Sequence, residues 1–366
     1  MEGVKRKEVV SYWQLFLLTI AQLGGASIIY LPGVFQAGKD VWISNLIASL
    51  MAYIVIFLHY LPMSLNPDSS MTSVINKYWG RCIGGIVNFY YFAFHFLLCC
   101  LILSDTYFFG KMTMPETPAY VFSVFLLVPI VYAIKQGIEV IARLLEIIIP
   151  FIFIMYILLF LLVIPQLEIT KLLPVMGDGI MPVLEGALPN LNFPYAQILP
   201  IAFLYRTTTE NKKRGSNFIK TSFLAILMAT LLLTVRSLAS AAAFDEETLV
   251  ALTYPPFSTI RLLQVGDVIE RLDSLMLATF YGTTFFKFLI TFYIATEIIS
   301  EYFKAGSPKE FALPLAVLIG VSMPFILPRL DLVLDTVIPY FWISLPLFVP
   351  VPLLLYLTIL IKGGDS

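Results

Sequence analysis

The stretch Leu188-Pro189-Asn190-Leu191-Asn192-Phe193-Pro194 interrupts an apolar segment that is long enough to cross a membrane. Pro189 and Pro194 each remove one helical hydrogen bond, and each disfavours helical geometry in the residue before it. A continuous helix is therefore hard to sustain between them. Asn190 and Asn192 have short side chains that can hydrogen-bond the local backbone instead. The pattern predicts a membrane segment whose helix is broken near its centre.

A second break is expected in the first apolar segment, where Gln22-Leu23-Gly24-Gly25-Ala26-Ser27 runs on through Pro32. Each glycine costs a helix about 1 kcal/mol relative to alanine. Glycine also reaches backbone angles that are closed to other residues. The alternative is that Gly24 and Gly25 form a close-packing helix face and that the prolines of the other segment only kink it.

The composition excludes several classes of protein. Of the 366 residues, 59% are hydrophobic and 13% are charged, whereas a soluble domain carries about 25% charged residues. This is too little charge to cover a soluble enzyme or to keep a chain disordered. The formal net charge is −1, so there is no basic field for nucleic acid. The expected surroundings are a lipid bilayer.

Ten segments have the length of a membrane helix, which is about 20 mostly apolar residues. They lie at about 10–36, 41–61, 82–108, 118–134, 139–164, 182–205, 217–243, 267–303, 310–327 and 335–361. The predicted fold class is therefore an all-α integral membrane protein with ten transmembrane helices, in which residues 1–366 form a single membrane domain. The longest polar connections are expected at 62–81, 206–216 and 244–266.

The first span is expected to be retained rather than removed as a signal peptide, because the apolar stretch continues past Leu31 without a small-residue cleavage site. With a cytoplasmic N-terminus and ten spans, the inside segments hold fifteen lysines and arginines and the outside segments hold five. Cytoplasmic loops carry the excess of positive charge. The bias predicts that both termini are cytoplasmic. Three basic residues remain inside the spans: Arg236, Arg271 and Lys287.

The two predicted breaks occupy matching places in two halves of five helices. The first repeat is expected at about 10–164 and the second at about 182–361. A repeat with an odd number of spans inserts its second copy upside down, so the predicted architecture is a five-plus-five inverted repeat with discontinuous helices 1 and 6. Broken helices at matching positions are typical of the binding site in transporter-like folds.

Such breaks favour a particular kind of ligand. Unwound backbone at bilayer depth is tolerated only where it is buried in protein or lines a wet cavity. Half-helix N-termini suit a carboxylate, and half-helix C-termini with free carbonyl groups suit an ammonium. A zwitterionic amino acid matches both, and so does a small uncharged metabolite. Leu191 and Phe193 would supply apolar walls.

The third span carries Asn88, Tyr91, His95 and Cys99 at spacings of three, four and four, which place them on one helix face. This face is expected to point into the bundle, where it either hydrogen-bonds a neighbouring helix or lines the cavity. Cys82, Cys99 and Cys100 are too few and too irregular for a disulfide framework. The chain has only two histidines and no grouping of nucleophile, base and orienting residue, so we expect no enzyme activity, cofactor or metal site.

The eighth span carries Thr284, Lys287 and Thr291 on one face. Lys287 lies near the middle of this span, and an ionisable residue at that depth is a functional hypothesis by default. We expect its ammonium to occupy the place of a coupling cation near the break of the first span, or to take part in proton-linked steps. The alternative is a buried ion pair that only fixes packing.

Several stretches resemble the spore germination permeases. Residues 252–261 and 266–273 resemble the segment before helix 8 of this family, and Phe285-Phe286-Lys287-Phe288 resembles the interior of helix 8. Gln14-Leu15-Phe16 with the stretch from Gly24 to Pro32 resembles helix 1. Asn192-Phe193-Pro194 with Leu199-Pro200 resembles helix 6. The resemblance covers essentially the whole chain.

The resemblance implies the integral B subunit of a nutrient germinant receptor, within the amino acid–polyamine–organocation superfamily. Such a protein would lie in the spore inner membrane or cell membrane with an A subunit and a lipoprotein C subunit, and would bind a nutrient, commonly an amino acid. The implied ligand-contact region contains the following residues of this chain: Gly24, Gly25, Ala26, Ser27, His95, Cys99, Asn190, Leu191, Asn192, Phe193 and Thr284. The alternative function is a proton-coupled amino-acid transporter, because the same fold serves both.

Overall fold

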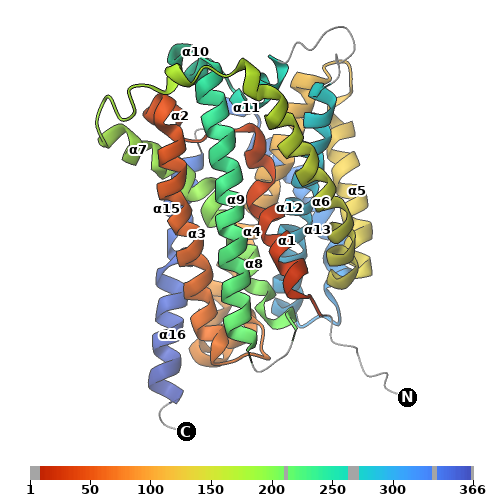
Figure 1. Ribbon diagram of the computed structural model, residues 1–366. Coiled ribbons are helices and arrows are strands. Elements are labelled where there is room, and N and C mark those ends of the chain that lie inside the picture. Colours follow the sequence, from red (N-terminus) through yellow and green to blue (C-terminus); the bar gives the residue numbers. More distant parts are fainter. Residues whose placement is uncertain (1–8, 210–212, 263–271, 332–335, 364–366) are drawn as a thin grey trace.

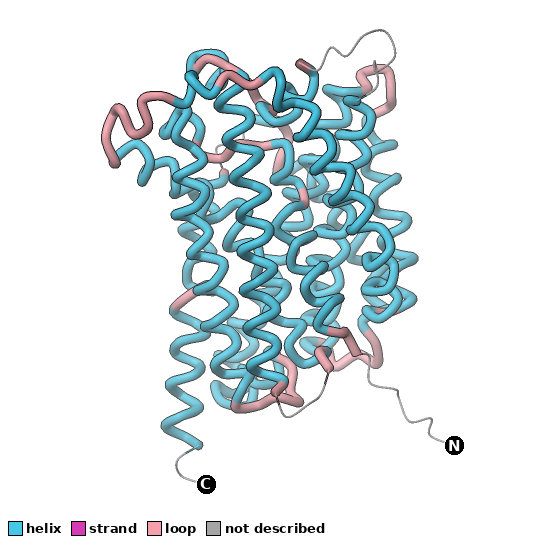
Figure 2. The backbone as a smooth tube through the Cα atoms, viewed as in Figure 1, coloured by secondary structure: helices cyan, strands magenta, loops and turns pink. Residues whose placement is uncertain are grey.

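The computed structural model describes residues 9–209, 213–262, 272–331 and 336–363, which form helices and connecting loops (Figures 1 and 2). The basic residues Lys5 to Lys7, Lys212 and the family-like stretch 266–271 lie outside the described residues. The long helices are α3 (Val41–Ser64), α4 (Met71–Thr113), α5 (Ala119–Gln136), α6 (Ile138–Val163), α9 (Arg214–Ala243), α12 (Leu272–Tyr302), α13 (Ala312–Ile326), α15 (Val337–Phe348) and α16 (Pro350–Gly363).

Seven helical segments of the described part are long and apolar enough to cross a membrane. They contain α3, α4, α6, α9, α12, α13 and the pair α15–α16. The fourth predicted span forms the shorter apolar helix α5. The first and sixth predicted spans are the two whose helices are broken. The predicted all-α membrane fold with ten helical segments and two discontinuous ones is confirmed.

Two of the predicted polar connections contain helix. The 62–81 connection includes the first turns of α4, which begin where the Ser70 side chain accepts a hydrogen bond from the Ser73 amide and bend at Gly80 (φ 75°). The 244–266 connection includes α10 (Glu246–Ala251) and α11 (Pro255–Arg261). A capping residue or an initial proline starts helix in each of these connections, although both are too polar to be spans.

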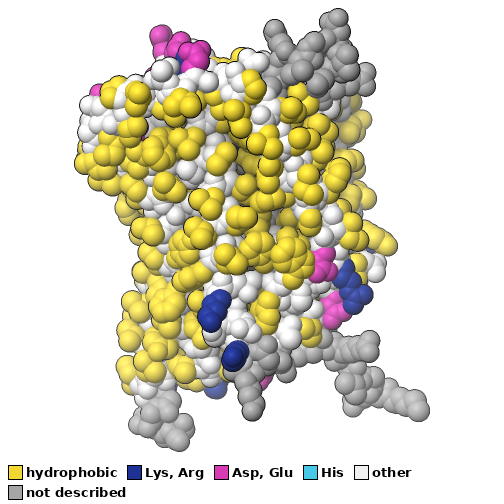
Figure 3. Space-filling model, viewed as in Figure 1, with side chains coloured by type: hydrophobic (Ala, Val, Ile, Leu, Met, Phe, Trp, Pro, Cys, Tyr) yellow, Lys and Arg dark blue, Asp and Glu magenta, His cyan; other side chains and the backbone are white. Residues whose placement is uncertain are grey.

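Helix α12 lies at the centre of the bundle (Figure 1), and 67% of its apolar window is buried, against 50% or less in the other candidate spans. On the face shown in Figure 3, hydrophobic side chains cover the broad middle, and charged side chains gather at the upper rim and in the lower part. The start of α1 and the end of α16 lie at the same lower end. An even number of crossings produces this arrangement. The cytoplasmic assignment of that end stays a prediction.

The first broken helix starts as α1 (Tyr12–Gly24), where Ser11 and Gln14 form a reciprocal capping box. It ends at Gly25, whose backbone angles (φ −2°, ψ −134°) leave the helical region. A 3₁₀ turn, η1 (Ala26–Ile29), continues the chain. The short helix α2 (Val34–Ala37) follows Gly33.

The sixth segment begins as α7 (Met181–Asn190) and widens into a π-helical turn, η5 (Leu191–Tyr195), in which Phe193 is non-helical (φ −119°, ψ 108°). It ends with three short pieces: η6 (Ala196–Ile198), α8 (Leu199–Phe203) and η7 (Leu204–Thr207). The break therefore lies within the predicted stretch, between Pro189 and Pro194. The helix survives Pro189, since one proline removes only one hydrogen bond, and it unwinds at the residue that precedes Pro194.

Candidate functional site

The two broken helices meet inside the bundle. Gln22 Nε2 of α1 donates a hydrogen bond to the carbonyl oxygen of Gln197 at 2.7 Å, and Asn190 Nδ2 of α7 donates to the carbonyl oxygen of Pro32 at 2.5 Å. Their backbones also approach closely, because a Cβ atom placed on Gly33 would lie 2.0 Å from the Gly186 carbonyl oxygen. Side-chain amides thus tie each break to the backbone of the other segment.

A cavity of about 360 Å³ lies beside this crossing. Residues 30–36, directly after the first break, form one wall. The sixth segment contributes Pro189, Asn192, Phe193 and Gln197, and helix α4 contributes Leu98, Leu101, Ile102 and Asp105. The lining is completed by Ala251, Leu252, Thr253, Pro255 and Ile338. This volume falls in the usual range for small-molecule sites, about 300–1,000 Å³. The cavity is mostly apolar, with a few polar groups that would orient a ligand.

Asp105 is the acidic side chain that lines this cavity. It is 5% exposed, and its Oδ1 accepts a hydrogen bond from the Tyr30 hydroxyl at 2.9 Å. Tyr30 follows the 3₁₀ turn of the first break, and its ring meets Phe193 edge-on at 5.6 Å and Tyr254 at 5.1 Å. Asp105 is thereby held against the break of helix 1 by a residue of that break.

Lys287 lies behind Phe193. Its side chain is fully buried, and Nζ sits 4.7 Å from the centroid of the Phe193 ring. The described residues offer Nζ no hydrogen-bond partner, so the ring face is the contact that stabilises the ammonium. The stem of Lys287 packs on Gly25, where an added Cβ atom would lie 2.2 Å from Lys287 Cδ. The lysine side chain therefore lies against the break of helix 1.

Arg236 of α9 is a second buried cation at the same break. It is 1% exposed, and it donates hydrogen bonds to the carbonyl oxygen of Ser27 and, at 3.3 Å, to Ser237 Oγ. The carbonyl that helix 1 frees at its break is thus satisfied by a guanidinium. Of the three basic residues left inside the predicted spans, two converge on this break, and Arg271 lies outside the described residues.

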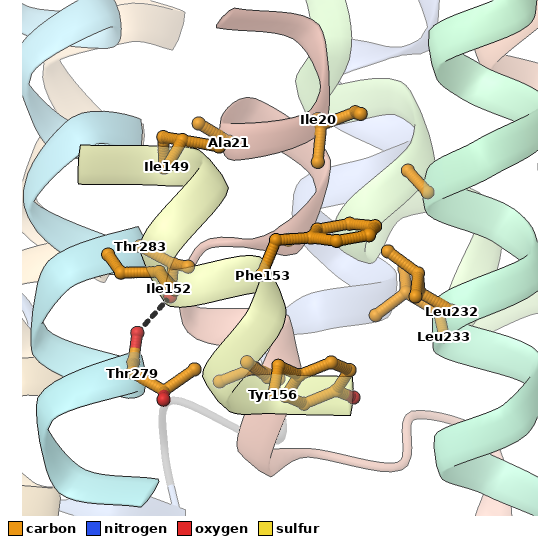
Figure 4. Close-up of a pocket in the computed structure, with 13 residues that line it drawn as sticks. Ile20, Ala21, Ile149, Ile152, Phe153, Tyr156, Leu232, Leu233, Thr279 and Thr283 are labelled. Atoms are coloured by element: carbon orange, nitrogen blue, oxygen red, sulfur yellow. Dashed lines mark hydrogen bonds between the residues drawn. The ribbon is translucent and has the colours of Figure 1, made fainter. Parts of the chain in front are cut away.

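A smaller apolar cavity of about 40 Å³ lies beside helix 1, where α1 meets α6, α9 and α12 (Figure 4). Gly24 belongs to its wall, and a Cβ atom added there meets nothing within 4 Å. Figure 4 shows the other contributors: Ile20 and Ala21 of α1, Ile149, Ile152, Phe153 and Tyr156 of α6, Leu232 and Leu233 of α9, and Thr279 and Thr283 of α12. The adjacent glycines therefore have different surroundings, because Gly25 touches Lys287 and Gly24 faces free space.

The predicted site residues fall into three groups. Asn192 and Phe193 line the larger cavity. A second group lies at or next to the two helix breaks: Gly24, Gly25, Ala26, Ser27, Asn190 and Leu191. The structure does not bring His95, Cys99 or Thr284 to the cavity wall; all three are fully buried in the surrounding helices.

On the face of the third span, Tyr91 is the residue whose hydrogen bonds reach other helices in the described structure. The Tyr91 hydroxyl lies 3.1 Å from His59 Nε2 of α3 and donates to the Leu347 carbonyl oxygen at 3.3 Å. His95 Nδ1 donates to the Tyr91 carbonyl oxygen of its own helix at 2.6 Å. These contacts favour the first of the two alternatives for this face, hydrogen bonding to neighbouring helices.

Sequence reasoning missed Asp105, Tyr30 and Gln197. Asp105 is an acid inside the predicted 82–108 span and follows Leu98 by seven residues, which places both on one face of α4. An ionisable residue within a span was the available signal. For Tyr30 and Gln197 the sequence offers none, because their place at the cavity depends on how the two breaks cross.

Ion pairs connect helices at the lower end of the bundle, beside a second cavity of about 320 Å³ whose lining includes Arg206, Thr207 and Glu297. Arg206 of η7 pairs with Glu297 of α12 at 2.6 Å and with Glu301 at 3.4 Å. Ser70 Oγ also donates to Glu301 at 2.5 Å. Val10, ahead of α1, forms backbone hydrogen bonds with residues 207 and 209 at the same end. These contacts join both broken segments to each other and to α12 at the end away from the larger cavity.

The fold is that of a multi-pass membrane protein built around two broken helices, and the same fold occurs among transporters of known structure. Among solved structures, the fold is similar to MhsT in complex with L-phenylalanine (TM-score 0.68, 14% identity, 97% of this chain and 90% of that chain). It is also similar to Mhp1, a nucleobase-cation-symport-1 family transporter in a closed conformation with bromovinylhydantoin bound (TM-score 0.69, 13% identity, 93% and 77%). Such low identities support the fold alone.

A family model described as "Spore germination protein" matches residues 9–328, and the chain belongs to this family. Its relatives include spore germination protein KB of Bacillus subtilis (strain 168), which is 24% identical over 318 residues, 85% of this chain and 83% of that protein. Spore germination protein YndE of the same organism is 26% identical over 299 residues, 80% of each chain. The resemblance found in the sequence is confirmed.

Proposed function

We propose that this protein is the nutrient-sensing membrane subunit of a spore germinant receptor, and that it binds a small molecule, an amino acid, between broken helices 1 and 6. The observation that carries the proposal is the cavity of about 360 Å³ beside the crossing of the two breaks, in a member of a spore germination family. MhsT, which has a similar fold, forms a complex with L-phenylalanine, and a ligand of that size suits this volume.

The ligand-binding region in this proposal comprises the crossing and its neighbours: Gly24, Gly25, Ala26, Ser27, Asn190, Leu191, Asn192 and Phe193. The proposed ligand-binding region also includes His95, Cys99 and Thr284, which are buried in the surrounding helices. Lys287 is proposed to act as the substitute for a coupling cation. Its buried ammonium against Phe193 supports this role, because Phe193 is both its contact and a wall of the cavity.

In the receptor, nutrient binding would bias partner subunits, the A subunit and the lipoprotein C subunit, in the spore inner membrane. A ligand biases an equilibrium only through different affinities for two conformations. The segments at the cavity also reach the lower end, where Arg206 pairs with Glu297 and Glu301. A ligand that moves the sixth segment would change the distances in these ion pairs. Both chain termini are proposed to be cytoplasmic, at this same end.

The second candidate is a proton-coupled amino-acid transporter, which the buried Lys287 and the transporter fold both favour. Two measurements separate the candidates. A thermal-shift screen of the purified chain against amino acids, sugars and nucleosides should find a stabilising amino acid, and failure of every compound would reject the binding site. Uptake of that labelled amino acid into vesicles containing this chain alone would favour the transporter, whereas binding without uptake favours the receptor subunit.

A further inference from the structure

The charge of the cavity lining deepens the proposed function, on which this inference rests. Among the residues that line the cavity, Asp105 carries the ionisable carboxylate, and the lining contains no lysine, arginine or histidine. The remaining walls are mainly aliphatic and aromatic. An acid in such an apolar enclosure is costly unless a positive group or several hydrogen bonds satisfy it.

The chain itself satisfies only part of this carboxylate. Tyr30 donates to Oδ1 at 2.9 Å, and no described group donates a hydrogen bond to Oδ2. Lys287 is the basic side chain nearby, but no ion pair within 4 Å joins it to Asp105 in the described structure, and its ammonium rests on the Phe193 ring instead. Phe193 also meets Tyr30 edge-on. Phe193 therefore contacts both the buried cation and Tyr30, while Lys287 and Asp105 attract each other without a direct ion pair.

We infer that Asp105, positioned by Tyr30, is the subsite for a protonated amine. The protein recognises the ligand mainly through its ammonium group and not through a carboxylate. Oδ2 of Asp105 is available to accept a hydrogen bond from one N⁺–H group of the ligand. A charge-assisted hydrogen bond of this type is stronger than one between neutral groups. Leu98, Leu101 and Ile102 on the same stretch of α4 would contact the apolar body of the ligand.

Two matched sets of compounds test this inference: leucine with 3-methylbutylamine and 4-methylpentanoate, and phenylalanine with phenethylamine and 3-phenylpropanoate. In each set the amine lacks only the carboxylate and the acid lacks only the amino group. Binding to the purified full-length chain is measured by thermal shift and by titration calorimetry. We expect the amines to bind and the acids not to bind.

The variant Asp105→Asn keeps the size of the side chain and still accepts the Tyr30 hydroxyl. It should weaken amine binding at least about 10-fold, in the range of a hydrogen bond to a charged group. Asp40→Asn is the matched control, because Asp40 is another buried acid, 7% exposed, that accepts from the Met176 amide at 2.9 Å and does not line the cavity. Tyr30→Phe, which keeps the carboxylate, should weaken binding by a smaller factor.

Amine affinity unchanged in a folded Asp105→Asn protein overturns the inference, and so does an acid that binds as tightly as its amine. In both cases amino-acid binding itself, and with it the proposed function, can still stand. If no amine, amino acid, sugar or nucleoside stabilises the wild-type chain, the proposed binding site is rejected, and the amine subsite is rejected with it. The unliganded melting temperatures of the variants show whether each of them is folded.

Discussion

The adjacent glycines of helix 1 provide a sharp test of the site, because one methyl group added to each should have opposite consequences. In Gly25→Ala, the new Cβ atom would lie 2.2, 2.7 and 2.9 Å from Cδ, Cβ and Cγ of Lys287. Real Cβ contacts are longer than this, so the lysine stem must move. In Gly24→Ala, the new atom meets nothing within 4 Å and points to the small apolar cavity.

The expected size of the effect follows from packing. Forcing a methyl group into a filled site costs about 1–3 kcal/mol, and displacement of Lys287 from Phe193 removes a cation–π contact worth about 2 kcal/mol when it is desolvated. Gly24 is the last residue of α1, where alanine gains up to about 1 kcal/mol of helix propensity over glycine. We therefore expect Gly25→Ala to destabilise the chain and Gly24→Ala to be neutral or stabilising.

The measurements are thermal unfolding of the purified chain and titration with the amino acid found by screening. Gly25→Ala should lower the melting temperature and weaken binding about 10-fold, which corresponds to about 1.4 kcal/mol. Gly24→Ala should leave both quantities near their wild-type values. Equal behaviour of the two variants, or wild-type binding by Gly25→Ala, would refute the placement of Lys287 against the break.

Three further predictions concern the buried and paired charges. Lys287→Met, with a side chain of similar length and no charge, should abolish the nutrient response of spores or lock it on, and a normal dose response would reject the cation-substitute role. Arg236→Met removes the charged donor to the Ser27 carbonyl oxygen, which then keeps only the Tyr30 amide at 3.3 Å, so the free energy of unfolding should fall by about 1–3 kcal/mol; an unchanged melting temperature would contradict the pairing. Arg206→Gln removes the ion pairs to Glu297 and Glu301, and a cysteine placed at residue 207 should then react faster with a membrane-impermeant maleimide. The same cysteine in the otherwise wild-type chain is the control for that last measurement, and equal labelling rates would show that these ion pairs do not limit access to residue 207.

The membrane class, the helical segments and both breaks follow from local sequence. Runs of apolar residues must be helical in a bilayer, since no water is available there for free backbone groups. The break at Gly25 follows from the absence of a side chain, and the break at Phe193 follows from the proline after it. Both effects act over one or two residues, so they could be predicted without coordinates. Within the stretch from Pro189 to Pro194, the structure places the break at the second proline, since α7 continues through Pro189.

The composition of the cavity was decided by the tertiary structure. Tyr30, Asp105 and Gln197 come from three separate helical segments, and their proximity depends on the crossing of the two breaks, which the amide of Asn190 secures. His95 and Cys99 share a helix face with the cavity residues of α4, yet they lie deeper, among neighbouring helices. Periodicity along a helix specifies the direction of a side chain, but its partner depends on packing between distant segments.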